Sequence, residues 1–334
     1  MIVFIFAGAL FGFSLARLQY LSINDTFCNA SKRSNSASPG ECYWYTIIPR
    51  YRIGVIIHLA TILPAGLLVV FQFVPAIRHK FILYHRIAGY VILLLALMSI
   101  ISAIVIVDQS FGGHIETQGA LGLLGIASVI GLSLAYYNIK RKQIDQHRAW
   151  MLRSWFWMSS IITLRLIMII SAMILSSASY YRLVYEPMPC PKVFFILVQA
   201  NTTFATAIDP AAELGRIYST CAGQATNVSA VALVRANMSG GAPGAGAALN
   251  AVFGMAAWLA LALHAIGVEI YLHLTPREAE RLRKVSYQRQ LEAGFKHPGS
   301  AGLVVQRLGD ADEWVMKDEG DNMTKHHEEP YIKT

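Results

Sequence analysis

Six long stretches of the chain are apolar and nearly free of charge. A bilayer core about 30 Å thick is crossed by about 20 apolar residues in a helix. A backbone inside lipid must also satisfy its own hydrogen bonds, which a helix does. The pattern therefore predicts an all-α fold, an integral membrane bundle of about six transmembrane helices. The stretches cover residues 1–18, 53–75, 87–107, 118–138, 154–175 and 250–273.

The composition supports a membrane protein over a soluble one. Charged residues make up 14% of the 334 residues and hydrophobic residues 55%, whereas soluble proteins carry about 25% charged residues. The formal net charge of +8 would by itself suggest nucleic acid as a partner, but the apolar content argues against this. We therefore expect the lipid bilayer as the partner, and no nucleic acid.

The basic residues between the apolar stretches predict an orientation. Segments 76–86 and 139–153 contain eight Lys and Arg in 26 residues, whereas segments 19–52, 108–117 and 177–249 contain eight in 117 residues. Because basic residues concentrate in cytoplasmic loops, the first two segments are predicted to face the cytoplasm. With six spans, both termini are then cytoplasmic, in a membrane of the secretory pathway or the plasma membrane.

The cysteines and the glycosylation motifs agree with this orientation. All four cysteines and five Asn-x-Ser/Thr motifs fall in segments predicted to lie outside, where disulfides and N-glycans form. Four cysteines allow three pairings. We favour the two that each close a single loop, Cys28–Cys42 and Cys190–Cys221, with free thiols as the alternative. These five motifs begin at Asn24, Asn29, Asn201, Asn227 and Asn237.

The predicted spans divide the chain into six parts. The first, 1–18, is a retained helix or signal anchor, or else a cleaved signal peptide; we favour retention because no basic residue precedes its apolar run. The others are an outer loop (19–52), a four-helix membrane core (53–175), an outer glycosylatable loop (176–249), a last span (250–273) and a cytoplasmic tail (274–334).

Both flanks of the last span carry readable signals. Residues 240–244 (Gly-Gly-Ala-Pro-Gly) predict a flexible link before it. After it, Thr275 and Glu278 have the spacing of a capping box, and a basic helix is expected to about residue 293, lying along the anionic inner leaflet. Beyond Gly299 the charges become mostly acidic, and we expect little order.

Polar residues in or at the membrane are costly, which makes them candidates for function. His85 opens the third span, and His147 and Arg153 precede the fifth, so all three are predicted at the inner face. Arg165 lies eleven residues into the fifth span, about 16 Å from its inner boundary. No carboxylate inside a span lies at that depth, so Arg165 requires backbone carbonyls, water or an anionic ligand. The alternative for these arginines is structural, as part of a basic belt or through internal hydrogen bonds.

The remaining histidines admit two interpretations. A single histidine on a membrane helix, such as His58 or His264, often donates an interhelical hydrogen bond. Alternatively, haem b takes two axial imidazoles, and the pairs His58–His114 and His85–His147 would hold haem on the outer and inner sides. His114 and His147 lie in connections rather than within spans, which weakens this hypothesis. The cysteine spacing is not that of a zinc site, and we expect no metal site.

Six segments carry recognisable motifs: Phe71–Pro75, His85–Tyr90 (H-R-x-x-G-Y), Gly112–Gly113, His147–Ser154 (H-R-x-W-M-x-R-S), Thr163–Arg165 (T-L-R) and Leu261–Gly294. Together they resemble a fungal family of multi-pass membrane proteins known only as a domain of unknown function, often labelled microtubule-associated protein. The resemblance covers about residues 50–310, and bacterial relatives share the central four helices. It implies a polytopic membrane protein and, since some members occur in secondary-metabolite settings, a lipophilic substrate. It implies no particular reaction.

Three functional hypotheses follow. The first is a membrane-embedded enzyme or binding protein for a lipophilic molecule with an anionic or carbonyl end, in which histidines act as general acids and bases and an arginine stabilises negative charge. The second is a b-type haem protein that carries electrons across the bilayer. The third is a non-enzymatic transporter or membrane scaffold, favoured by the lack of a recognised catalytic motif. The first hypothesis assigns catalysis to His85, His147, Arg153 and Arg165, and possible ligand contacts to Arg86, Gln72 and His58.

Overall fold

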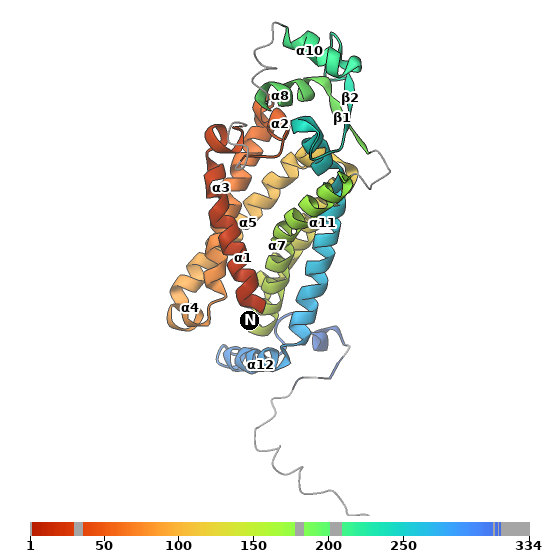
Figure 1. Ribbon diagram of the computed structural model, residues 1–334. Coiled ribbons are helices and arrows are strands. Elements are labelled where there is room, and N and C mark those ends of the chain that lie inside the picture. Colours follow the sequence, from red (N-terminus) through yellow and green to blue (C-terminus); the bar gives the residue numbers. More distant parts are fainter. Residues whose placement is uncertain are drawn as a thin grey trace, which may run out of the picture. The chain divides into compact units, whose positions relative to one another are not determined.

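A computed structural model describes residues 2–29, 36–177, 184–200, 209–309, 311–312 and 314 (Figure 1). The chain divides into two compact units. The first comprises residues 1–129 and 156–266, and the second comprises residues 130–155 and 267–334. The fold is mostly helical, as expected, and the described residues contain a single pair of short strands.

Five helices are long and apolar enough to cross a membrane. They are α3 (Pro49–Gln72), α5 (Ile82–Ile106), α6 (Ile115–Lys140), α7 (Ile144–Leu175) and α11 (Gly241–His273). Each begins before its apolar stretch, because the polar residues at the boundary continue the helix. The sixth predicted span is α1 (Ile2–Arg17), a shorter helix of 16 residues followed directly by the 3-10 turn η1 (Leu18–Leu21).

In the first unit, α1 and α5 both pack against α3. A Cβ atom on Gly66 of α3 would lie 2.5 Å from the Ser14 hydroxyl oxygen of α1, so the absence of a side chain lets the two helices approach. Ser14 is buried at this contact. The short helix α4 (Pro75–Lys80) connects α3 to α5.

A disulfide cap covers one end of the helices of the first unit (Figure 1). We use this name for the described residues of 36–47 and 184–240. They form α2 (Cys42–Ile47), β1 (Tyr185–Pro189), α8 (Cys190–Ala200), α10 (Pro210–Ile217), η5 (Ser219–Cys221) and β2 (Val231–Arg235). The two strands are antiparallel, with Tyr185 opposite Arg235 and Pro189 opposite Val231. The disulfides Cys28–Cys42 and Cys190–Cys221 are both present, which confirms the favoured pairing.

The core of the first unit joins the cap to the long helices. Leu164 of α7 and Phe253 of α11 are almost fully buried together with Met188 of β1 and Val193 of α8. The predicted flexible link at 240–244 is wrong. Gly241 already begins α11, and a Cβ atom on Gly244 would lie 2.8 Å from the Asn237 carbonyl oxygen, so the glycines serve close packing rather than freedom of movement.

In the second unit, the tail helix α12 (Pro276–Leu291) docks onto the turn between α6 and α7 through a buried polar network. Gln143, Ser286 and Gln290 are all 0% exposed. The Gln290 amide donates to the Gln143 side chain (2.9 Å) and to the Arg141 carbonyl (3.0 Å), and the Ser286 hydroxyl accepts from the Ile144 N–H (2.8 Å). Complete pairing makes such a network a rigid joint.

Two expectations about the tail are wrong. The Thr275 side chain does not cap α12. Its hydroxyl donates to the Tyr271 carbonyl (3.1 Å), because the last carbonyls of α11 need donors. The expected lack of order is wrong for residues 300–309: the Gly302 N–H donates to Gln143 (3.1 Å), and the 3-10 turn η6 (Val305–Leu308) follows. Residues 315–334, to which the same expectation applied, lie outside the described residues.

Candidate functional site

Arg165 lies on two stacked aromatic rings in the first unit. Its guanidinium carbon is 4.5 Å from the ring centre of Phe111 and 5.7 Å from that of Phe253. The two rings stack with centres 4.2 Å apart. Within the described residues, no hydrogen bond or ion pair engages the guanidinium. A partly buried arginine thus keeps its donors available beside an aromatic surface.

Glu41 brings a carboxylate close to this arginine. It directly precedes α2 and is 5% exposed. Its carboxylate accepts a hydrogen bond from the Phe111 N–H at 2.7 Å. Burial raises the pKa of Glu41, and the attraction of Lys192, the Phe111 N–H and Arg165 offsets this rise only in part. The sequence showed no carboxylate at the depth of Arg165 within the apolar stretches. The structure places Glu41, from the segment before α2, near it.

Three more ionisable side chains, two of them from the cap, complete a charge cluster with Glu41 and Arg165. Lys192 on α8 is 4% exposed, and burial lowers its pKa despite the attraction of Glu41 and Glu186. Glu186 on β1 is equally buried and accepts a hydrogen bond from His114 Nε2 at 2.8 Å. This bond raises the pKa of His114. We call Glu41, His114, Arg165, Glu186 and Lys192 the charge cluster.

The turn before α6 is shaped around this cluster. Phe111 has φ +46, a left-handed conformation that is strained for an aromatic residue, and the bond to Glu41 holds it. Gly112 has φ +86, and a Cβ atom there would lie 2.8 Å from His114 Nε2 and 2.9 Å from a Glu186 carboxylate oxygen. Gly113 has φ +67, and its Cβ atom would overlap the Asp108 carbonyl. At both positions, the positive φ and the lack of space for a Cβ atom require glycine.

The residues predicted to form a catalytic site are divided between the units. His85 and Arg165 belong to the first unit, and His147 and Arg153 to the second. Arg153 makes a two-fold ion pair with Glu269, at 2.6 and 2.9 Å. His147 Nδ1 bonds to the Ala135 carbonyl at 2.9 Å. Because a carbonyl only accepts, this nitrogen carries the proton, which leaves Nε2 as the base.

The other predicted ligand residues have different surroundings. Arg86 is exposed on α5. Gln72 is buried at the end of α3, and within the described residues its amide nitrogen has no hydrogen-bond partner. His58 Nδ1 bonds to the Ser99 carbonyl at 3.1 Å. Of these three predicted ligand residues, Gln72 has a buried amide donor that could bond to a ligand.

His264 forms an interhelical hydrogen bond. Its Nδ1 bonds to the Phe156 carbonyl at 2.7 Å, and its Nε2 to the Thr163 hydroxyl at 2.8 Å. Both partners lie on α7, so this histidine joins α7 to α11. Within the described residues, no group of three or more His, Cys, Asp or Glu could hold a metal ion.

The glycosylation motifs differ in accessibility. Asn24 and Asn227 are exposed, whereas Asn29 and Asn237 are half-buried. The side-chain oxygen of Asn237 accepts from the Ser239 N–H at 2.9 Å. Asn201 lies outside the described residues.

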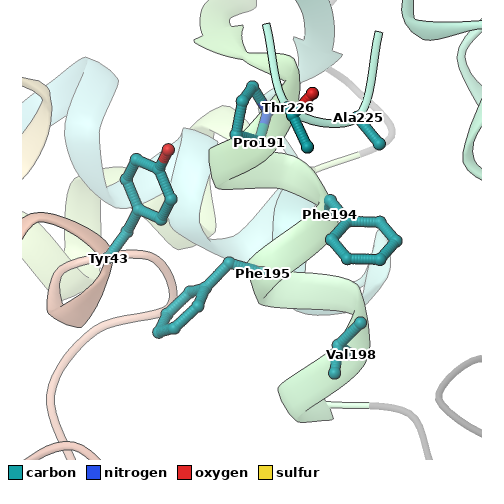
Figure 2. A pocket seen from close by; sticks show the side chains of 7 residues that line it. All are labelled: Tyr43, Pro191, Phe194, Phe195, Val198, Ala225 and Thr226. Carbon is teal, nitrogen blue, oxygen red and sulfur yellow. The ribbon is translucent and has the colours of Figure 1, made fainter. Parts of the chain in front are cut away.

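An apolar groove of about 360 Å³ lies on the outer side of α8, as Figure 2 shows. Among the described residues, those that line the groove include no member of the charge cluster and no charged side chain. The lining residues are Tyr43, Pro191, Phe194, Phe195, Val198, Ala225 and Thr226.

Sequence reasoning missed Glu41, Glu186 and Lys192, and it assigned His114 to a haem pair rather than to a site with Arg165. It searched for acids only inside apolar stretches, whereas Glu41 and Glu186 come from the connections. One usable signal was present: Glu41 directly precedes Cys42, and a disulfide holds its neighbour in place. Lys192 is likewise close to a disulfide, since it follows Cys190 by two residues on α8.

The comparisons with known proteins agree with a membrane protein. Residues 55–186 match a family described as "Predicted membrane protein (DUF2306)". The matched segment runs from α3 to β1 and includes His114, Arg165 and Glu186, but not Glu41 or Lys192. No match was found among curated proteins or among solved structures. Over these residues the chain is similar to a family of predicted membrane proteins of unknown function.

Proposed function

We propose that this membrane protein binds a lipophilic molecule at the charge cluster, with the anionic or carbonyl end of the molecule on Arg165. The observation that carries the proposal is the guanidinium on the Phe111 and Phe253 rings without a hydrogen-bonded protein acceptor within the described residues. A desolvated guanidinium with free donors binds carboxylate or carbonyl oxygens strongly. The two aromatic rings supply apolar contact beside it.

The charges around Arg165 favour an anion over a cation. The two carboxylates, Glu41 and Glu186, are balanced by Arg165 and Lys192, and a protonated His114 leaves one positive charge in excess. The raised pKa of His114 favours this protonated form near neutral pH. An incoming carboxylate would neutralise the excess.

The cluster also contains groups suited to proton transfer. The pKa of the Glu41 acid is raised and that of the Lys192 base is lowered, so their affinities for a proton lie closer together than in water. This supports an enzymatic role for the cluster, in which a group positioned beside the ligand donates or accepts a proton. In this proposal the cap and its glycosylation motifs face the exoplasmic side, and both termini face the cytoplasm.

The test is the lipophilic molecule that copurifies with the protein. Native mass spectrometry of the detergent-purified full chain is expected to show a bound molecule that Arg165→Gln loses. Arg52→Gln is the matched control, because Arg52 is a half-buried arginine of the same unit whose guanidinium donates to the Asn24 side chain. A folded Arg165→Gln variant that keeps the same molecule would contradict the proposal.

A haem protein remains the second candidate, on one specific observation. His58 donates its Nδ1–H to a backbone carbonyl, which leaves Nε2 as the unprotonated ring nitrogen that an axial histidine uses. The bond from His114 Nε2 to Glu186 counts against the His58–His114 pair. A Soret band in the detergent-purified protein, lost in His58→Ala or His147→Ala, would support haem, and its absence from protein made with haem supplied would exclude this candidate.

A further inference from the structure

One of the glycosylation motifs lies at the rim of the apolar groove on α8. The motif Asn227–Ser229 directly follows Ala225 and Thr226, which both line the groove. Figure 2 shows these two residues on the loop that passes beside Pro191 and Phe194. A sugar on Asn227 would therefore begin next to the groove.

This loop is tied to α8 by covalent and hydrogen bonds. The Cys190–Cys221 disulfide joins the start of α8 to the segment before the loop. The Cys190 N–H donates to the Ala230 carbonyl at 2.8 Å, and the Gln224 N–H donates to the Cys221 carbonyl at 3.0 Å. The motif is thus bracketed by bonds that fix its position relative to the groove.

The side chain of Asn227 is exposed, as an N-glycosylation site must be. Its Oδ1 accepts from the Ser229 N–H at 3.0 Å, which places the hydroxyl residue of the motif beside the amide. Its Nδ2, the atom that carries the sugar in an N-glycan, donates one hydrogen to Gln224 Oε1 at 2.8 Å. The Asn227 N–H also donates to the Gln224 carbonyl at 3.0 Å, so the two residues between them form the tip of a turn. The attachment atom therefore lies at the base of the turn whose tip lines the groove.

Asn237 has the same local hydrogen bond but not the same accessibility. Its side chain accepts from the Ser239 N–H at 2.9 Å, yet it is half-buried. Its N–H donates to the Gly244 carbonyl at 3.1 Å, and a Cβ atom on Gly244 would lie 2.8 Å from the Asn237 carbonyl oxygen. The start of α11 packs on Asn237, which leaves Asn227 as the better acceptor.

The chemistry of the groove suits a neutral sugar. The rings of Tyr43 and Phe195 meet edge to face with centres 5.6 Å apart, and Phe194 adds a third ring to the lining. Among the described residues, no charged side chain lines this volume of about 360 Å³, which is of the size that holds small molecules. Sugar rings present C–H groups that pack on aromatic faces, and N-acetylglucosamine carries no charge.

We propose that Asn227 carries an N-linked glycan whose first N-acetylglucosamine units pack in the groove on α8. In the transfer, Nδ2 of Asn227 loses one hydrogen as a proton and forms a bond to C1 of the sugar. The bond from C1 to the lipid-linked diphosphate of the donor breaks, and the diphosphate leaves. The second Nδ2 hydrogen stays available for Gln224.

A glycan in this position covers apolar side chains of the cap that would otherwise face water. This role requires the cap to face the exoplasmic side, but it does not depend on a ligand at the charge cluster. The glycan is then part of the folded cap rather than a solubilising appendage.

Occupancy of the motifs is the first test. The full chain is made in yeast and treated with peptide N-glycosidase in heavy-oxygen water, which converts each glycosylated asparagine to labelled aspartate. Peptide mass spectrometry is expected to find the label at Asn227 and not at Asn237. An unlabelled Asn227 would overturn the proposal.

The second test asks whether the glycan stabilises the fold. Asn227→Gln and Ser229→Ala both remove the motif, and Ser229→Ala keeps the bond between Asn227 and Gln224. Each should lower the unfolding midpoint in detergent by about 2–4 °C, because the groove loses its contacts with the sugar. Asn24→Gln is the matched control, since Asn24 is an exposed asparagine of another motif in the same unit, and it should leave the midpoint unchanged. If a motif variant fails to fold, glycosidase treatment of the folded parent gives the same comparison.

Phe194→Leu separates packing in the groove from other effects of the glycan, because leucine keeps the apolar bulk but lacks the aromatic face. In this background, Ser229→Ala should lower the midpoint less than it does in the parent, as expected for two groups in contact. An equal drop in both backgrounds would overturn the groove as the place where the glycan packs. Coupling of Phe194→Leu to Asn201→Gln instead of Ser229→Ala would overturn the choice of Asn227.

Discussion

At the scale of single residues, the two adjacent glycines of the turn before α6 do different work. Gly112 leaves space for the hydrogen bond between His114 and Glu186, whereas Gly113 leaves space for the Asp108 carbonyl. Only Gly113 faces a backbone atom that cannot move aside. A Gly-Gly pair in the sequence is therefore weak evidence for a particular turn, because the role of each glycine depends on neighbours that are distant in the sequence.

Gly113→Ala is expected to destabilise the protein by roughly 2–4 kcal/mol, because a Cβ atom would overlap a backbone oxygen at a left-handed position. Gly122→Ala is the control. Gly122 lies within α6 and has nothing within 4 Å of an added Cβ atom. This control should be neutral, or stabilising by about 0.5–1 kcal/mol. Unfolding midpoints in detergent measure both, and an equal effect of the two changes would refute the role given to Gly113.

The bond between His114 and Glu186 predicts a pH dependence. The pKa of His114 in the folded protein is raised above the ordinary value of 6.5, chiefly by Glu186 and less by Glu116. Burial and Lys192 oppose this rise. The pair therefore stabilises the folded state fully below pH 6.5, and the stabilisation is lost as the pH rises through the folded pKa.

Unfolding midpoints of the parent and of Glu186→Gln, measured from pH 5 to pH 9, check this prediction. The difference between them should be largest at low pH and shrink above neutrality. Glu213→Gln serves as the control, because Glu213 pairs with Arg216, which does not titrate in this range. A difference that grows with pH would contradict the predicted protonation of His114.

At the scale of secondary-structure elements, α12 shows how a polar face replaces an apolar one. Leu282, Ser286 and Gln290 form its buried face, at the i, i+4, i+8 spacing of one helix side. Two of these three residues are polar, so the hydropathy pattern by itself gives no sign that this face of α12 packs against other parts of the chain. The partners of Ser286 and Gln290 include main-chain groups of Arg141, Ile144 and Gly299 and the side chains of Gln143 and Asp145.

Gln290→Ala is expected to release α12 and the segment after it. The change removes hydrogen bonds to Arg141, Gln143 and Gly299, and a loss of roughly 2 kcal/mol makes cleavage of the open form about thirtyfold faster. Limited proteolysis followed by mass spectrometry measures cleavage within residues 291–308. Gln288→Ala, an exposed neighbour on the same helix, should cleave at the parent rate, and equal rates for all three proteins would refute the joint.

Periodicity and composition predicted some elements well and others poorly. The five long helices were predictable because each must bury an apolar length set by the bilayer. The disulfides were predictable because each closes one loop. The charge cluster was not, because Glu41, Glu186 and Lys192 owe their burial to packing between the cap and α7 and α11, which no local pattern encodes.

At the scale of the whole molecule, the account depends on how the chain crosses the membrane. The helix α11 separates the cap, which ends at residue 240, from α12, which begins at Pro276. If α11 crosses the bilayer, the residues before it and the residues after it belong to opposite sides. In the proposed orientation, the charge cluster would then meet molecules on the exoplasmic side.

The most direct measurement of this central claim is cysteine labelling on both sides of α11. All four native cysteines are in disulfides, so single cysteines can be introduced at exposed positions, as Val228→Cys and Gln288→Cys. In sealed microsomes, a membrane-impermeant maleimide is expected to label Gln288→Cys at once and Val228→Cys only after detergent is added. Labelling of both without detergent would contradict the account.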